Sequence, residues 1–276
     1  MIGLAYSVRD PAGKGIAEYL VKELKLRKSS VCRRSEACLE GDLIVLAGFN
    51  EDVIYFDFLE SRLPSDIDFY IVLSRHSSEA GVRSYTVHAT GNFSSDTSHG
   101  GRPRELGIAF PSAEWFILRS LNSLSLDFKR RDEYEVSYEA THHGPTSLAK
   151  PVFFVEIGSS INEWADPVNH AVVGEAVKSL ISAYPPSIHC TPVIGIGGGH
   201  YPRKHTEVSL RENLCYGHIA SKHALNYLDI ELLYAMIKRT RERIDGVVVE
   251  KKSTRYEHRL LVEGFSKEVG INLKYI

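Results

Sequence analysis

Several common features are missing from this 276-residue sequence, and each absence excludes a class of protein. The four cysteines are scattered at Cys32, Cys38, Cys190 and Cys215 without a C-x-x-C pair, so we expect ordinary thiols and no disulfide framework or zinc ribbon. The longest apolar runs are of strand length, which argues against a membrane span. The first residues lack the basic start and cleavage site of a signal peptide, so a cytoplasmic protein is expected.

The sequence also has no large excess of positive or negative residues, and its formal net charge is only −2. Global charge therefore does not indicate a nucleic-acid partner, and any such partner must bind local basic patches. The candidate patches are Arg27, Lys28, Arg33 and Arg34; Lys129 to Arg131; and Lys238, Arg239, Arg241 and Arg243. Each patch also fits an ordinary solvated surface.

Apolar runs that alternate with amphipathic stretches predict an α/β fold. The continuous apolar runs predict buried strands at 2–8, 43–47, 69–73, 153–157 and 193–196. No repeat or proline-rich linker divides the chain, so a single α/β domain covering residues 1–276 is expected. No feature indicates an oligomer, and we expect a monomer.

Helices are predicted where apolar periodicity and capping signals coincide. Asp166 followed by Pro167 predicts a helix start. Thr254 and Glu257 form a capping-box pattern before another helix, which Gly270 would end. Further helices are expected after a turn at residues 11–13 and along residues 117–128.

The 12 histidines often lie beside glycine or at strand ends, a placement typical of a functional site. The stretch from Ala89 to Ala109 is the least regular and contains His99, Arg102 and Arg104, so it is either a flexible surface loop or a lid or RNA contact. His76 and His88 lie at two strand ends, and each alone is better explained as structural.

The first histidine cluster, Glu139-Ala-Thr-His-His-Gly-Pro145, follows an alternating strand pattern. Adjacent histidines on an extended chain point to opposite sides, so His142 and His143 share one metal ion only if the backbone turns between them. A packing histidine next to an exposed one is the alternative.

The second cluster is a strand that runs into Gly197-Gly198-Gly199-His200-Tyr201. Successive glycine amides can hold a phosphate or a developing oxyanion. The cluster lacks the Gly-Lys-Ser/Thr ending of a P-loop and the spaced glycines of a dinucleotide site, which excludes both. A structural glycine turn is the alternative. A third element, Glu156, places a carboxylate inside an apolar strand. In a cleft it would need a histidine or metal partner, and at a sheet edge it would simply be solvated.

Together these sequence motifs resemble those of the archaeal and plant type of D-aminoacyl-tRNA deacylase, also called D-tyrosyl-tRNA deacylase. The resemblance rests on residues 139–146, on Glu156-Ile-Gly-Ser159 with Trp164 downstream, and on Gly195-Ile-Gly-Gly-Gly-His-Tyr201. Residues 74–77, Gly91-Asn92 and Gly217-His218 extend it over most of the chain.

The resemblance implies hydrolysis of the ester between a D-amino acid and tRNA, a step of translation quality control, with zinc as cofactor. It also implies a three-layer α/β fold with a mixed, mostly parallel sheet, similar to phosphorylases and peptidyl-tRNA hydrolase. The motif positions predict His142, His143 and Glu139 as catalytic and His142, His143, Glu156 and His200 as metal ligands. The predicted substrate-binding residues are Thr141, Gly197, Gly198, Gly199, Tyr201, Arg203, Lys204 and His218.

Two other functions remain open on the residues alone. One is a peptidyl-tRNA hydrolase or zinc-dependent amidohydrolase on a related core. The other is a noncatalytic RNA-binding protein with structural histidines. We further expect the loop of His142 and the loop of His200 to meet in one cleft, with Glu156 facing it.

Overall fold

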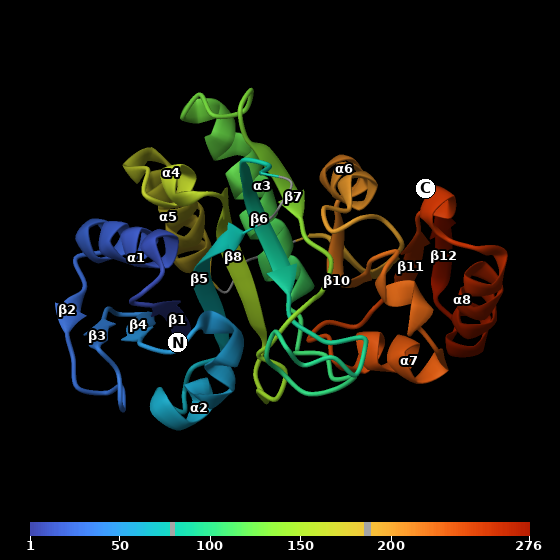
Figure 1. Ribbon diagram of the computed structural model, residues 1–276, viewed down its shortest axis with the longest axis horizontal. Helices are drawn as coiled ribbons and strands as arrows, with labels where there is room; N and C mark the ends of the chain where they lie inside the picture. The colour runs from blue at the N-terminus through green and yellow to red at the C-terminus, as the bar shows by residue number, and fades with distance from the viewer. Residues whose placement is uncertain (78–80, 185–188) are drawn as a thin grey trace.

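The computed structural model describes residues 1–77, 81–184 and 189–276 and contains two sheets that lie side by side (Figure 1). The large sheet contains, in spatial order, β2 (Arg27–Lys28), β3 (Ala37–Glu40), β4 (Ile44–Phe49), β1 (Ile2–Ser7), β5 (Phe69–Ser77), β8 (Val152–Ser159), β6 (Ser84–Ala89) and β7 (Glu135–Tyr138). The small sheet contains β10 (Leu214–Ala220), β9 (Thr191–Ile196), β11 (Gly246–Val249) and β12 (Asn272–Tyr275).

The pairing is mostly parallel, as predicted. All described pairs of the small sheet are parallel, and so are β4–β1, β1–β5, β5–β8 and β6–β7 of the large sheet. The antiparallel pairs are β2–β3, β3–β4 and β6–β8. The reversal at β6 is important for the site, because it puts the carboxyl end of β6 at the edge opposite to those of β5 and β8.

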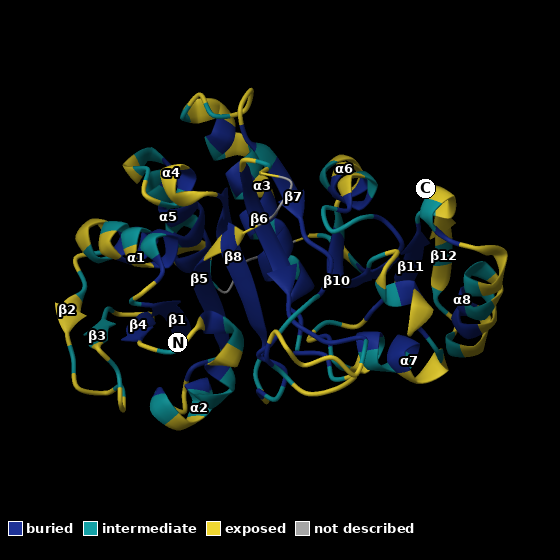
Figure 2. Cartoon of the chain, in the orientation of Figure 1, coloured by how far each residue is buried: buried dark blue, intermediate teal, exposed yellow. Residues whose placement is uncertain are grey.

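Helices and short helical turns cover both faces of the large sheet. One face packs on α1 (Pro11–Glu23), α3 (Pro111–Asp127) and α5 (Pro167–Ala183), with α4 (Ile161–Trp164) beside them. The other face carries η1 (Val53–Phe58) and α2 (Leu59–Arg62). The three-layer α/β prediction is therefore confirmed. Figure 2 shows the central strands of the large sheet buried between these layers, whereas β2 is exposed and β3 partly exposed at one edge.

The remaining helices belong to the second half of the chain: α6 (Arg203–Glu212), η2 (Ala224–Asn226), α7 (Ile230–Lys238), η3 (Lys251–Ser253) and α8 (Tyr256–Val269). α7 and α8 pack on the small sheet around Leu233, Met236 and Phe265. The main core also includes Val193 and Tyr216 of the small sheet, so apolar packing is continuous between the two sheets.

Local signals explain most helix ends. Asp166 accepts a hydrogen bond from Val168 N and caps α5 as predicted, and Gly270 ends α8 with a positive φ of 70°. Two expectations were wrong at helix starts. Pro11 is the first residue of α1 rather than part of a preceding turn, because Asp10 accepts from the Ala12 and Gly13 amides. Thr254 does not cap α8, since its hydroxyl group bonds to Glu250 O and Lys251 O; Arg255 occupies the cap position.

The expectation of four ordinary thiols was wrong. Disulfides join Cys32 to Cys38 and Cys190 to Cys215, with Cα–Cα distances of 5.8 and 5.7 Å. Parallel pairing of β9 and β10 sets Cys215 opposite Pro192, and this brings Cys190 within reach. No short cysteine motif signals this pairing, because strand partners in the fold produce it.

The two disulfides predict unequal contributions to stability. The Cys190–Cys215 bond closes a separation of 25 residues and the Cys32–Cys38 bond one of 6 residues. In the loop-entropy model these bonds stabilise the fold by about 3.5 and about 2 kcal/mol. We expect the double variant Cys190→Ala/Cys215→Ala to lose more free energy of unfolding in denaturant titrations than Cys32→Ala/Cys38→Ala. Equal losses in the two double variants would contradict this expectation.

Candidate functional site: a histidine and glutamate cluster on one face of the large sheet

Polar side chains share one face of the large sheet at β5, β8 and β6. In the strand register, Ser74 of β5 and Thr86 of β6 lie on either side of Glu156 of β8. Because side chains alternate along a strand, His76 and His88 lie on this face too, whereas their neighbours Leu73, Val87 and Val155 enter the main core. We expected a site in loops beyond the carboxyl ends of the strands, but its floor is the face of the sheet itself.

Two loops close over this face. Glu139 follows β7, and its amide donates to Val87 O of β6 at 3.1 Å. The next amide, Ala140 N, donates to His200 O at 2.9 Å, which joins the two predicted histidine loops. The ring centroids of His142 and His200 lie 4.6 Å apart. The predicted meeting of these loops over Glu156 is therefore confirmed.

The backbone does turn between His142 and His143. His143 has a φ of 46°, in the left-handed region. The two rings consequently lie side by side, with centroids 4.3 Å apart, instead of pointing to opposite sides. The condition under which both can face one ion is met.

Glu139 is the centre of the cluster. Its buried carboxylate lies 2.8 Å from His200 Nε2, 3.0 Å from His76 Nδ1 and 3.6 Å from His142 Nε2. Burial raises the pKa of this carboxyl group, but the contacts with His200 and His76 outweigh it and hold the pKa well below its usual value. Glu139 is therefore ionised and orients the imidazoles around it.

Glu156 is the second buried carboxylate. Ser74 Oγ donates to it at 2.6 Å, and His76 Nδ1 and His88 Nε2 lie 3.3 and 3.7 Å from it. Burial opposes ionisation, yet the hydrogen bond with His76 and the charge of the nearby His88 lower the pKa of Glu156 to about 2. Conversely, Glu139 and Glu156 overcome the effect of burial on His76 and raise its pKa to about 10. The pKa of His88 is raised for the same reason, chiefly through Glu156.

His88, His142 and His143 form a group of three whose ligand atoms lie within 4.8 Å of one another. In each ring Nδ1 faces a backbone carbonyl: Ala89 O at 3.0 Å, Ala140 O at 2.8 Å and Gly144 O at 2.6 Å. A carbonyl accepts only from a protonated nitrogen, so in the neutral form of each ring these bonds leave Nε2 with its lone pair.

Burial lowers the pKa of two of these rings, well below the usual value for His142 and to about 4 for His143, and neighbouring histidines add to the effect. Both rings are thus neutral at pH 7 and have the protonation state of a metal ligand.

Two further groups lie next to this one: His76 with Glu139 and His200, and His88 with Glu139 and Glu156. The predicted ligand set of His142, His143, Glu156 and His200 is thus distributed over all three groups. His76 and His88 join the groups although each alone looked structural, and their buried Nε2 atoms have no hydrogen-bond partner among the described residues. The sequence signal that identifies them is a polar residue at every second position of β6 and the pair Ser74 and His76 at alternate positions near the end of β5.

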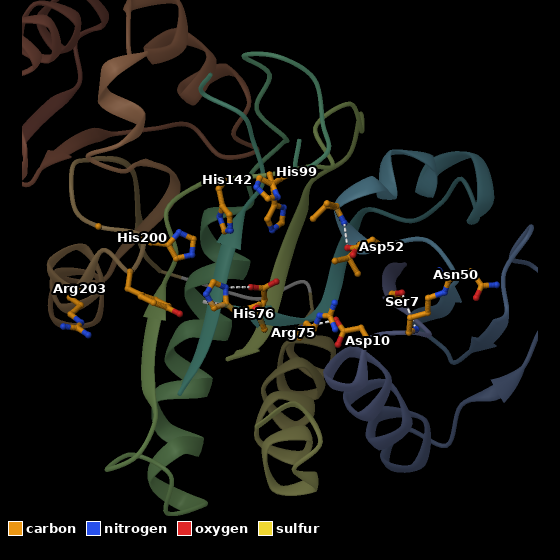
Figure 3. Close-up of a pocket in the computed structure, with 18 of the residues that line it drawn as sticks. Ser7, Asp10, Asn50, Asp52, Arg75, His76, His99, His142, His200 and Arg203 are labelled. Atoms are coloured by element: carbon orange, nitrogen blue, oxygen red, sulfur yellow. Dashed lines mark hydrogen bonds and ion pairs between the residues drawn. The ribbon is translucent and has the colours of Figure 1, made fainter. Parts of the chain in front are cut away.

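An open cleft of about 1050 Å³ leads to the cluster. Figure 3 shows its labelled side chains running from Arg203 and His200, past His142 and His76, to Asp10 and Asn50. The far end is formed where β1 and β4 end, with Ser7, Arg9 and Asp52. His99, from the irregular stretch between residues 89 and 109, also lines the cleft.

Only some of the predicted substrate-binding residues line the cleft. Gly199, Tyr201, Arg203 and Lys204 line the cleft, but Arg203 is held by two bonds to Glu135, at 2.8 and 2.7 Å. The amides of Gly197 and Gly198 donate to Ala220 O and Ser253 Oγ, so they are not free to bind an oxyanion as expected.

Thr141 and His218 are buried and contact each other, with Thr141 Oγ1 and His218 Nδ1 3.2 Å apart. His218 Nε2 bonds in turn to Arg239 O at 3.0 Å. His218 thus fastens the first histidine loop to the second half of the chain, and its contacts are structural.

Comparison with known proteins gives consistent matches over the chain. The family model of D-aminoacyl-tRNA deacylase matches residues 63–274. D-aminoacyl-tRNA deacylases of Desulfurococcus amylolyticus and Staphylothermus marinus are 57% and 54% identical, over 100% and 99% of both chains. That of Thermococcus kodakarensis is 34% identical over 95% of both chains.

Among solved structures, a conserved protein of unknown function, AF0625, is 27% identical with a TM-score of 0.91. The match covers 100% of this chain and 95% of that one.

Proposed function

Since this chain belongs to the D-aminoacyl-tRNA deacylase family, we propose that its cleft hydrolyses the ester bond of D-aminoacyl-tRNA and releases free D-amino acid and tRNA. The observation that carries this proposal is the ionised, buried Glu139 in contact with three imidazoles that line an open cleft. Ester hydrolysis needs an activated water, and such a cluster supplies a base of fixed orientation.

His200 is the proposed general base. Its Nε2 lies 2.8 Å from the Glu139 carboxylate, which favours the tautomer with the proton on Nε2 and leaves Nδ1 as an acceptor. Its side chain is 41% exposed and lines the cleft, so water reaches it. His200 takes a proton from water as the water oxygen attacks the ester carbonyl. The same proton then passes to the ribose oxygen as the carbon–oxygen bond breaks.

We also propose that the cluster holds zinc. The fit of the residues supports this, because three imidazoles, two of them neutral at pH 7, bring their Nε2 atoms close together next to two carboxylates that need positive charge in a buried setting. His88, His142 and His143 would be the protein ligands, with Glu139, Glu156, His76 and His200 around them. A bound zinc ion lowers the pKa of water and polarises a carbonyl group.

Substrate tRNA would bind through local cations, since the net charge is only −2. Among the described residues, Arg9, Arg75 and Lys204 line the cleft without an ion-pair partner.

No described helix is long and apolar enough to cross a membrane. We propose that the protein acts in the cytoplasm. We also propose that it is a monomer, because the exposed apolar side chains are scattered over unrelated elements.

Deacylation of one tRNA charged with D-tyrosine or with L-tyrosine tests the proposed reaction. We expect the purified protein to release D-tyrosine at least about 100-fold faster than L-tyrosine at equal enzyme concentration, a difference that corresponds to about 3 kcal/mol of transition-state discrimination. Peptidyl-tRNA in a parallel reaction separates this function from an amide hydrolase on a related core.

Equal rates on the two enantiomers, or turnover of peptidyl-tRNA alone, would contradict the proposed reaction. Binding of tRNA without any turnover would instead support a noncatalytic RNA-binding protein.

A further inference from the structure

A second, smaller hollow adjoins the histidine loops. This side pocket has a volume of about 240 Å³ and is lined by Phe93, Asp96, His223 and Tyr227, among others. It shares His99, His142 and His143 with the cleft. The same imidazoles thus stand between two hollows of very different size.

The two hollows differ in size, and so do the two halves of an aminoacyl ester, a small amino acid and a larger nucleotide. The cleft, at about 1050 Å³, is large enough for a nucleotide. The side pocket, at about 240 Å³, has room for roughly eight water molecules, which suits one amino-acid side chain but not a nucleoside with its phosphate. The reacting ester has to lie at the histidines, with one half on either side.

The charges of the two hollows differ as well. The cleft offers Arg9, Arg75 and Lys204 without ion-pair partners among the described residues, which suits the phosphates of tRNA. The described lining of the side pocket contains no lysine or arginine and one carboxylate, Asp96. A carboxylate repels phosphate but attracts the α-ammonium group of an amino acid.

Aromatic groups complete the contrast. Phe93 is buried beneath the side pocket, and Tyr227 is 50% exposed at its wall. Tyr227 is held in place by its backbone, since its carbonyl oxygen accepts from Arg104 at 3.2 Å. Its ring is thus available to pack against an apolar side chain of a ligand.

We propose that the side pocket binds the amino-acid half of the substrate, with its side chain against Phe93 and Tyr227 and its ammonium group toward Asp96. The terminal adenosine and the preceding phosphates lie in the cleft. This assignment rests on the proposed deacylase function and makes Tyr227 a determinant of side-chain preference.

The test compares kcat/KM for D-tyrosine and D-alanine carried on the same tRNA. We expect Tyr227→Ala to lower kcat/KM for D-tyrosyl-tRNA about tenfold more than for D-alanyl-tRNA, because only the larger side chain contacts the lost ring. Arg9→Ala should lower both values several-fold by the same factor and make their salt dependence shallower by about one unit of log–log slope. Melting curves establish that the variants are folded.

Matched controls are Tyr256→Ala, an exposed tyrosine on α8, and Arg27→Ala on the outer strand β2, both outside the two hollows. Neither control should change the ratio between the substrates. An unchanged ratio in Tyr227→Ala, or a changed ratio in Arg9→Ala, overturns the assignment while the wild-type protein remains a deacylase. A wild-type protein that hydrolyses neither substrate overturns the reaction and the assignment together.

Discussion

Replacing Glu139 with glutamine is expected to lower kcat for D-tyrosyl-tRNA by roughly 10³- to 10⁴-fold, the size of the effect when the carboxylate behind a catalytic histidine is lost. Glutamine keeps the shape of the side chain but removes the charge that orients His200 at 2.8 Å and stabilises His76 at 3.0 Å. Glu139 acts through these histidines as a positioning residue. The loss should therefore appear in kcat, with KM for the tRNA within about threefold of wild type.

The control for this substitution is Glu114→Gln. Glu114 is equally buried but lies on α3, outside the cleft, and burial raises the pKa of its carboxyl group well above the usual value. A carboxyl group that is already neutral loses little when it becomes an amide, so kcat should stay within about twofold. A Glu139→Gln variant with wild-type kcat would remove Glu139 from the mechanism.

Removal of zinc is expected to have the second large effect. Dialysis against a chelator should lower the rate at least about 100-fold, and zinc at one equivalent or more should restore it. His143→Ala removes one of the three Nε2 donors and should weaken zinc binding by at least about 100-fold, measured as metal bound per chain. His189→Ala replaces an exposed histidine outside the cluster and should keep the metal.

Metal analysis separates this prediction from activity. A zinc-free protein with full activity would rule out the metal and favour His200 acting as general base alone. A His143→Ala variant that keeps its zinc would show that the ion lies in another group of the cluster, such as His76, Glu139 and His200.

Residues close together in the chain were the easiest to predict. Glu139, His142, His143 and His200 stand next to glycine or at strand ends, and such short motifs are visible without the fold. The same holds for Asp166, whose cap depends only on its neighbours. The fold class followed from alternating apolar segments, which are also local patterns.

Features that depend on strand pairing were missed. His76 and His88 belong to β5 and β6, and they come near the same carboxylate, Glu156, because β8 lies between these two strands and pairs with both. The partnership of Cys190 with Cys215 likewise depends on β9 lying beside β10. The occupied amides of Gly197 and Gly198 were missed for a related reason, since their acceptors come from residues 220 and 253.

The polar residues on one face of the large sheet lower the thermal stability of the protein but are needed for its catalytic activity. Ser74, Thr86 and His88 are buried at strand positions where valine or isoleucine would pack without the cost of desolvating polar groups. Directed evolution that rewards thermal survival alone should therefore replace these residues with aliphatic ones. Only continued selection for turnover keeps the middle of this sheet polar.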